Sequence, residues 1–234
     1  MRKTDLHEVI RALKSESDRR NIEGMERFGI STKGTLGVSI PKIREIAKEI
    51  GKDHALALEL WDSGIHEAKI LASMIDDPEL VTEKQLEKWV MMIDSWDVCD
   101  CVCSNLFDKT RFAKAKAFEW AVREEEYVRR AGFVLMACLS VHDKGMKDSE
   151  FVPFLKEIEK GCTDERNFVR KAVNWALRQI GKRNLRLNKL AISTCNKIAV
   201  KDSKSARWIA SDALRELSSN AVQSRLKWRE SKSR

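Results

Sequence analysis

Three segments in the second half of the sequence resemble one another and share the apolar spacing of helices. They are VRRAGFVL, VRKAVNWAL and ARWIASDAL, which begin at Val128, Val169 and Ala206. The intervals of 41 and 37 residues lie in the range of paired-helix repeats of the HEAT and armadillo kind. Because one such helix cannot bury its apolar face alone, neighbouring repeats must stack. The repeats predict an all-α fold, a curved solenoid of antiparallel helix pairs.

Earlier parts of the chain have the same helical character. The segment PKIREIAKEI (residues 41–50) begins with proline at a first helical position, and its apolar residues recur at steps of three and four. Asp-Ser-Gly at residues 62–64 separates two further helices, and Thr82 is a favourable N-cap. The chain has only three prolines and ten glycines, which favours long helices over strands and tight turns.

Positive charge is concentrated at the end of the chain. Residues 182–234 contain fourteen Lys or Arg and four Asp or Glu, whereas residues 1–181 contain thirty and thirty-two. Such asymmetry indicates a polyanionic partner, most commonly nucleic acid, or else a solvated helical surface with a frayed basic end. We expect one HEAT-like domain over residues 1–222 and a basic, loose tail over residues 223–234.

Basic residues occupy matched positions in the three similar segments. In a stacked array, equivalent helices line one concave face, so these side chains would form a ladder of positive charge along it. The alternative is that they neutralise local carboxylates at helix ends. The basic end of the chain favours the ladder. The candidate DNA-binding residues are Arg129, Arg130, Arg170, Lys171, Arg178, Lys182, Arg183 and Arg207.

The segment DSWDVCD (residues 94–100) is the best candidate for chemistry. A helix that begins at Ser95 places Trp96 and Asp100 four residues apart on one face. An aromatic ring beside a carboxylate suits a sugar that develops positive charge, although such a pair also occurs often by chance. Asp97 falls in the first turn, where a carboxylate stabilises the helix dipole, and we assign it that role.

Trp175 also has basic neighbours at helical spacing. Lys171 and Arg178 share its face, an arrangement that suits packing against a phosphodiester backbone. The residues alone favour the alternative, a core tryptophan covered by the stems of basic side chains. The remaining tryptophans that we assign to the core are Trp61, Trp89, Trp120 and Trp208.

The cysteine pattern gives no indication of a metal site. Six cysteines without a secretory leader indicate a reducing compartment and free thiols. On a helix, Cys99 and Cys103 share a face while Cys101 points away, and the sequence has no CxxC spacing. We therefore expect no metal and no cofactor. No apolar run has the ~20 residues that span a bilayer, so we expect no membrane association. We also expect a monomer. Its expected location is the cytoplasm, in association with the nucleoid, or the nucleus if the cell has one.

Taken in order, several segments resemble the DNA alkylation repair family, the AlkD-type helical-repeat alkylpurine DNA glycosylases. They are PKIREIAKEI, ELWDSGIHEAKILA, SWDVCD, VRRAGFVL and VRKAVNWALRQIGKRN, and the resemblance spans about residues 24–217. It implies excision of N3- and N7-alkylated purines from duplex DNA in base excision repair, without base flipping. Non-catalytic DNA binding and protein scaffolding remain the alternatives.

The resemblance also implies roles for individual residues. The family's catalytic aspartate falls on Asp100, its two tryptophans that flank the damaged nucleotide's backbone on Trp96 and Trp175, and a DNA-facing arginine on Arg130. Ser95 stands where a compared member has a second tryptophan, and STKGTLGV (residues 31–38) replaces an aromatic-rich stretch. Alkylated purines are cationic leaving groups that need no general acid, so one carboxylate should suffice where ordinary glycosidases use two.

Overall fold

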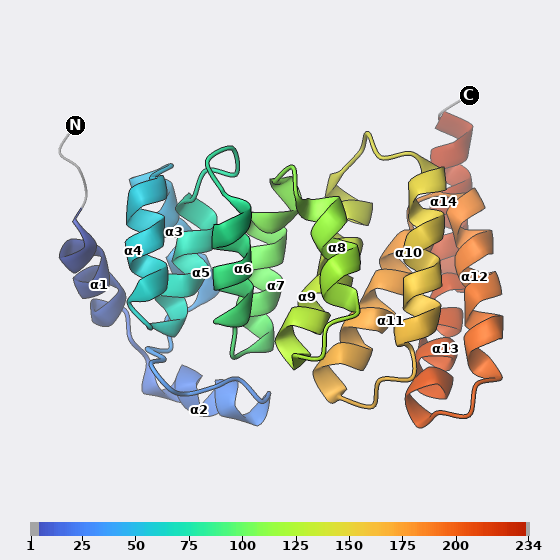
Figure 1. The fold of residues 1–234 in the computed structure, drawn as a ribbon, viewed down its shortest axis with the longest axis horizontal. Coiled ribbons are helices and arrows are strands. Elements are labelled where there is room, and N and C mark those ends of the chain that lie inside the picture. The colour runs from blue at the N-terminus through green and yellow to red at the C-terminus, as the bar shows by residue number, and fades with distance from the viewer. Residues whose placement is uncertain (1–4, 233–234) are drawn as a thin grey trace. The chain divides into compact units, whose positions relative to one another are not determined.

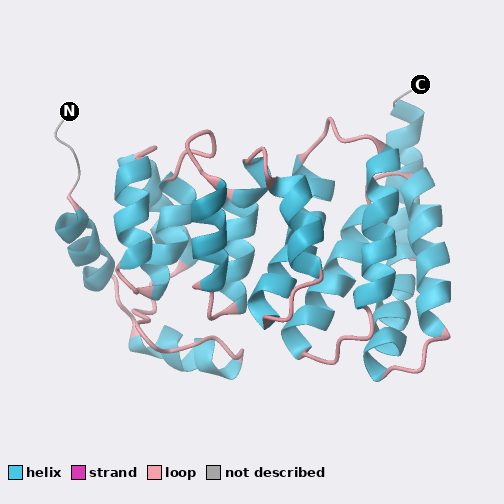
Figure 2. Cartoon of the chain, viewed as in Figure 1, coloured by secondary structure: helices cyan, strands magenta, loops and turns pink. Residues whose placement is uncertain are grey.

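The computed structural model describes residues 5–232, and within them it contains only helices and connecting loops (Figures 1 and 2). This confirms the all-α prediction. The chain divides into two compact units, residues 1–111 and residues 112–234. The sequence analysis expects one domain over residues 1–222. In the structure, these residues are divided between the two units. The curvature of the stack stays a prediction.

The described part of the first unit consists of short α-helices and one 3-10 helix. They are α1 (Leu6–Ser15), α2 (Arg19–Arg27), α3 (Ile40–Ile50), α4 (His54–Asp62), α5 (His66–Ile75), α6 (Glu83–Met91), α7 (Trp96–Asn105) and η1 (Phe107–Lys109). Side-chain caps set several starts: the Asp53 side chain accepts from the Leu56 N–H, and Thr82 accepts from the Gln85 N–H, as predicted. Gly64, with φ of 72°, makes the predicted break between α4 and α5.

Two tryptophans form the centre of the first unit's core. Trp61 and Trp89 are fully buried and stack with ring centroids 4.0 Å apart and planes 3° from parallel. Phe107 of η1 packs against Trp89. Aromatic rings of this size bury a large apolar area, so the pair fixes α4 against α6. The core assignment of both tryptophans is confirmed, as is that of Trp120 in the second unit.

The second unit contains longer helices within its described residues. They are α8 (Ala113–Ala121), α9 (Glu126–His142), α10 (Asp148–Gly161), α11 (Asn167–Gly181), α12 (Leu185–Ala199), α13 (Lys204–Leu217) and α14 (Asn220–Lys232). The three similar segments lie at the starts of α9, α11 and α13; α9 packs on α11, and α11 packs on α13. Gly132 permits the close approach of α8 to α9, because a Cβ there would lie 2.4 Å from the Ala121 nitrogen.

The end of the chain differs from the loose tail expected from residue 223. It forms the helix α14, which continues to Lys232. Val222 and Leu226, one turn apart, are buried, and the Gln223 amide donates to the Leu217 carbonyl oxygen at 2.7 Å. A single turn of apolar contacts therefore anchors a helix whose basic composition concealed it. No helix among residues 5–232 has the length and apolar character needed to cross a membrane.

Candidate functional site

The two candidate residues in the first unit share helix α7. Trp96 opens this helix, Asp100 follows one turn later, and both side chains are half-buried. Ser95 is the N-cap and is fully buried, but its hydroxyl does not cap the backbone. It donates instead to the carboxylate of Asp97. The predicted start of the helix is confirmed, and its first turn has tertiary partners that the sequence did not reveal.

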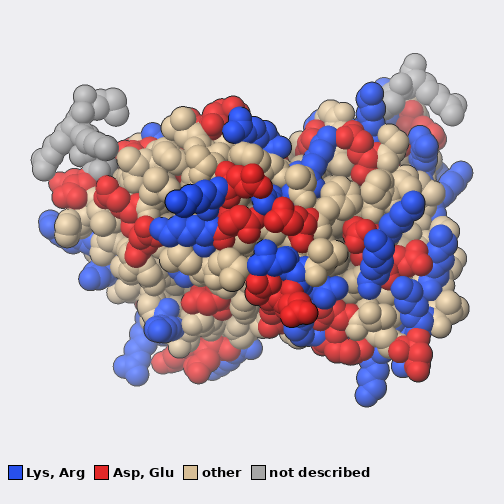
Figure 3. All heavy atoms as spheres, viewed as in Figure 1, with Lys and Arg blue, Asp and Glu red and all other residues tan. Residues whose placement is uncertain are grey.

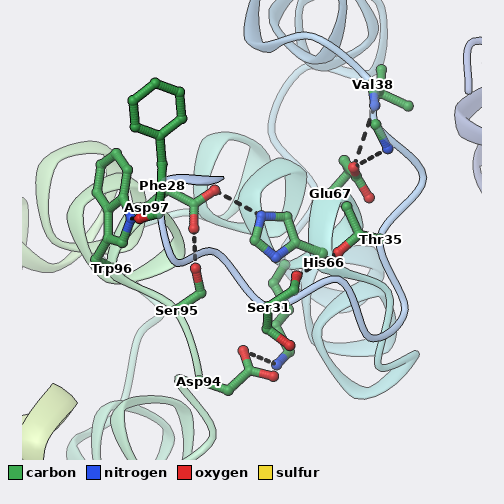
Figure 4. A network of polar contacts seen from close by, with 12 residues as sticks. Phe28, Ser31, Thr35, Val38, His66, Glu67, Asp94, Ser95, Trp96 and Asp97 are labelled. Carbon is green, nitrogen blue, oxygen red and sulfur yellow. Dashed lines mark hydrogen bonds and ion pairs between the residues drawn. The ribbon is translucent and has the colours of Figure 1, made fainter. Parts of the chain in front are cut away.

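Asp97 joins the start of α7 to α5. His66 Nε2 donates to the Asp97 carboxylate at 2.8 Å, and the His66 side chain is only 2% exposed (Figure 4). Burial by itself would raise the pKa of Asp97, but the hydrogen bonds from His66 and Ser95 outweigh it and hold the pKa below its ordinary value. Asp97 therefore does more than stabilise the helix start: it fixes the position of α7 against its neighbour.

Trp96 is in contact with the end of α2. Its indole N–H donates to the carbonyl oxygen of Phe28 at 3.0 Å, and Figure 4 shows the Phe28 ring near the indole. Phe28 is 72% exposed, although it is a large apolar residue. The first unit thus presents two neighbouring aromatic side chains at the start of α7, one half-buried and one at the surface.

Glu67 fixes the loop between α2 and α3. Its carboxylate is 1% exposed and accepts the backbone N–H groups of Leu36 at 2.9 Å, Gly37 at 2.7 Å and Val38 at 3.3 Å. Gly37 has a φ of +77°, and a Cβ there would lie 2.1 Å from the Asp18 carbonyl oxygen, so only glycine fits. The segment over residues 31–38, where the sequence departs from the family pattern, is thereby held on α5.

The cysteines of α7 surround Asp100 in sequence but are not arranged for a metal. Cys99 and Cys103 are buried, and Cys101 is half-buried. Burial, followed by the negative charges of Asp97 and Asp100, raises the pKa of the Cys101 thiol to about 12. Among residues 5–232 no three His, Cys, Asp or Glu side chains gather as a candidate metal site.

Trp175 lies on α11 and therefore in the second unit, whereas Trp96 and Asp100 lie in the first. Its side chain is half-buried. Lys171, one turn earlier, is exposed, while Arg178 binds the Glu216 carboxylate at 2.6 Å. Of the two basic neighbours predicted for Trp175, Lys171 is therefore exposed to solvent and Arg178 forms an ion pair with Glu216.

Arginines lie in corresponding positions at the starts of α9, α11 and α13. We call Arg129, Arg170 and Arg207 the arginine row. Each has a local partner: Asp164 lies 3.5 Å from Arg129, Asp202 lies 3.3 Å from Arg207, and Arg170 stacks over the Trp208 ring at 5.2 Å. Both interpretations of the sequence therefore apply in part. The arginines occupy corresponding positions on successive helices, and two of them lie beside local carboxylates.

The residue after each arginine of the row differs between the three helices. Arg130 on α9 is 5% exposed and donates to the Phe168 carbonyl oxygen, which gives it a structural role in the folded unit. Lys171 on α11 is exposed. Trp208 on α13 is 38% exposed, so its assignment to the core was wrong. Its ring lies under the Arg170 guanidinium at the surface.

The remaining candidate cations lie at the opposite end of α11. Lys182 and Arg178 both bind Glu216 at 2.6 Å. Burial would raise the pKa of Glu216, but these two cations lower it. Arg183 donates to the Ser140 and Met146 carbonyl oxygens at 2.9 Å and stacks over Phe151. On the face shown in Figure 3, Lys and Arg side chains gather over α10 and α12, with carboxylates among them.

The sequence profile of the DNA alkylation repair enzyme family matches residues 9–217, almost the whole chain. The chain belongs to this family. A solved structure superposes on this chain with a TM-score of 0.77 at 19% identity, over 91% of this chain and 95% of the other. That protein is described as one of a new family related to the HEAT-like repeat DNA glycosylases, with affinity for branched DNA structures.

The similarity establishes that the two proteins share the HEAT-like fold. An engineered protein also aligns, at 12% identity over 92% of this chain and 99% of its own length, but with a TM-score of only 0.41. No curated protein sequence matches this chain.

Proposed function

We propose that this member of the DNA alkylation repair enzyme family is a DNA glycosylase that excises cationic N3- and N7-alkylated purines from duplex DNA. The observation that carries the proposal is the pairing of Asp100 with Trp96 on one half-buried face of α7, in a chain of this family. The hydrogen bond between His66 and Asp97 holds the start of that helix in place. Such fixed geometry is what an electrostatic catalyst requires.

Asp100 carries the chemistry in this proposal. An alkylated purine is already cationic, so it leaves without protonation, and the sugar develops oxocarbenium-like charge. A unit charge pair at about 4 Å contributes ~4 kcal/mol at an effective dielectric constant near 20, or about three decades in rate if the effect is confined to the transition state. The Asp100 carboxylate stabilises the sugar cation and orients the attacking water.

The other candidate residues bind the DNA. Trp96 contacts the sugar–phosphate of the damaged nucleotide, so a base-flipping pocket is not required, and Trp175 contacts the DNA backbone through the second unit. The arginine row and the exposed Lys171 bind backbone phosphates, which fixes register without reading sequence.

Base release from methylated duplex DNA tests this proposal. We expect Asp100→Asn, which removes one charge at constant size, to lower the excision rate by orders of magnitude while DNA affinity holds. Asp94→Asn is the matched control, because Asp94 lies in the same segment, is half-exposed and pairs with Lys69 at 3.5 Å. A folded Asp100→Asn protein that excises at the wild-type rate contradicts the assignment.

Structure-specific DNA binding without excision is the second candidate. It is favoured by the solved structure at 19% identity, whose protein is described as having affinity for branched DNA. Wild-type protein that binds branched DNA but releases no alkylated base from any substrate would support this function in place of the first.

A further inference from the structure

A basic groove lies within the second unit, at the carboxyl-terminal ends of α9 and α11. It has a volume of about 770 Å³, and α14 forms one of its walls. Seven of its sixteen lining residues are Lys or Arg, and two, Asp148 and Glu230, are acidic. The lining cations that are exposed are Lys144, Arg186, Arg225, Arg229 and Lys232. A concave surface with this excess of positive charge attracts a polyanion.

An exposed tryptophan stands among these cations. Trp228 lines the groove and is 62% exposed. Arg225 precedes it by three residues and Lys232 follows it by four, so all three lie on one side of α14. The helix is anchored through the buried residues Val222 and Leu226, so the ring is presented from a fixed support.

The groove is separate from the arginine row. Arg129 lies in the first turn of α9, whereas Ser140 and Val141, which line the groove, lie in its last turn. With a rise of 1.5 Å per residue, these positions are about 17 Å apart along the helix. The groove is therefore a second basic surface of the unit, distinct from the arginine row, and two of the other candidate DNA-binding residues, Lys182 and Arg183, line it.

We propose that this groove binds an unpaired strand of DNA. The exposed cations of the groove contact successive phosphates, and a base stacks on the ring of Trp228. Base stacking on an aromatic ring together with a cationic track is the general mode of single-strand binding, and bases inside a duplex have no free face to offer. The inference goes beyond the proposed function, because it requires neither Asp100 nor excision.

A membrane surface fits this helix less well than a nucleic acid strand. A helix that lies on a bilayer inserts an apolar face between the lipid headgroups. The large aliphatic residues of α14, Val222 and Leu226, are 6% and 1% exposed, so they are buried against the protein and cannot insert. Trp228, the large exposed apolar side chain of this helix, lines a concave basic surface.

Binding of a fluorescent oligo(dT) strand to the full-length protein, followed by anisotropy, tests the proposal. We expect Trp228→Ala to weaken binding by about 5-fold to 100-fold, the range for loss of one stacked base, and Trp228→Phe to restore most of it. Arg225→Gln should lower the salt slope of log K by about 0.7 for the one lost phosphate contact. Lys227→Gln is the matched control, since this exposed lysine of α14 does not line the groove.

Excision of alkylated bases from intact duplex should stay at the wild-type rate in Trp228→Ala, which separates this proposal from the first. Circular dichroism confirms that each variant folds. Wild-type affinity for oligo(dT) in folded Trp228→Ala would overturn the proposal, as would equal effects of Arg225→Gln and Lys227→Gln. Loss of binding to anionic lipid vesicles in Trp228→Ala, with oligo(dT) binding intact, would assign the groove to a membrane instead.

Discussion

The two units use their polar side chains differently. Residues 1–111 contain seventeen Lys or Arg and twenty-one Asp or Glu, whereas residues 112–234 contain twenty-seven and fifteen. The first unit buries carboxylates: Glu67 accepts three backbone N–H groups, and Asp76, fully buried, accepts from His54 and Gln85 at 2.6 Å. In the second unit Glu216 instead lies beside two partly exposed cations, Arg178 and Lys182.

This difference shows how one fold can divide two tasks. Buried carboxylates with several donors hold backbone segments in a single position, which suits a unit that must present α7 with fixed geometry. Half-exposed ion pairs contribute little to stability but allow a high density of positive charge without self-repulsion. Under the proposed function, the first unit would provide positional accuracy and the second would attract the DNA.

The largest expected effect is on the free energy of unfolding, measured after removal of one carboxylate from each unit. Glu67→Ala leaves three buried N–H groups without their acceptor and should lower the free energy of unfolding by about 3 kcal/mol or more. Glu216→Ala should cost about 1 kcal/mol or less, because its ion pairs are partly exposed. Urea denaturation measures both, with the exposed Glu59→Ala as control. Equal losses for Glu67→Ala and Glu216→Ala would remove the distinction between the units.

The next effect is expected on the salt dependence of DNA affinity when the arginine row is replaced. If about five phosphates are neutralised, log K for duplex DNA should fall against log salt with a slope near −4.5. Replacing Arg129, Arg170 and Arg207 by Gln should reduce the magnitude of that slope by about 2.7, with no dependence on DNA sequence. Lys33→Gln and Lys48→Gln, exposed positions of the first unit, are the controls. An unchanged slope in the triple variant would show that the row does not contact phosphates.

A smaller effect is expected at Asp97 and depends on pH. The folded-state pKa of Asp97 lies below its ordinary value of 3.8, so its carboxylate stabilises the fold above about pH 5, and this contribution is lost as pH falls through the folded pKa. Asp97→Asn should therefore cost about 2 kcal/mol at pH 7 and progressively less below pH 4. Urea denaturation across pH measures it, and a cost independent of pH would disprove the electrostatic role.

The smallest effect is expected at Cys101. Its pKa of about 12 keeps the thiol protonated at pH 8, so iodoacetamide should leave it unmodified in the native protein and modify it after unfolding. Mass spectrometry of the alkylated peptide distinguishes the two states. Rapid native modification of Cys101 would show that the face of α7 next to Asp100 is more open than the structure has it.

Helices and their boundaries were largely readable from the sequence, because their signals are local. The proline of residues 41–50, the glycine at the α4–α5 break and the Thr82 cap each act within one turn, and the three similar segments repeat at a fixed interval. Local signals failed at the end of the chain. The basic residues of α14 suggested a tail, and only the packing of Leu226 against its neighbours shows a helix.

The candidate site was less predictable, since its partners are distant in sequence. Thirty-one residues separate His66 from Asp97, and sixty-eight separate Phe28 from Trp96. Glu67 carried no sequence signal at all, because its role depends on a loop thirty residues away. The corresponding helix positions of Arg129, Arg170 and Arg207 follow from the sequence repeat, but the partners that bury Arg130 and pair Arg178 appear only when the helices pack.

The most direct test of the account measures excision and affinity on the same DNA, with one variant from each unit. Single-turnover release of methylated purines gives the rate, and anisotropy of the same duplex gives Kd. Asp100→Asn should lose orders of magnitude in rate with Kd unchanged or slightly lower, whereas Arg170→Gln should raise Kd and keep the rate at saturating protein. A folded Asp100→Asn protein with the wild-type rate, or an Arg170→Gln protein that loses rate but not affinity, would contradict the division of tasks between the units.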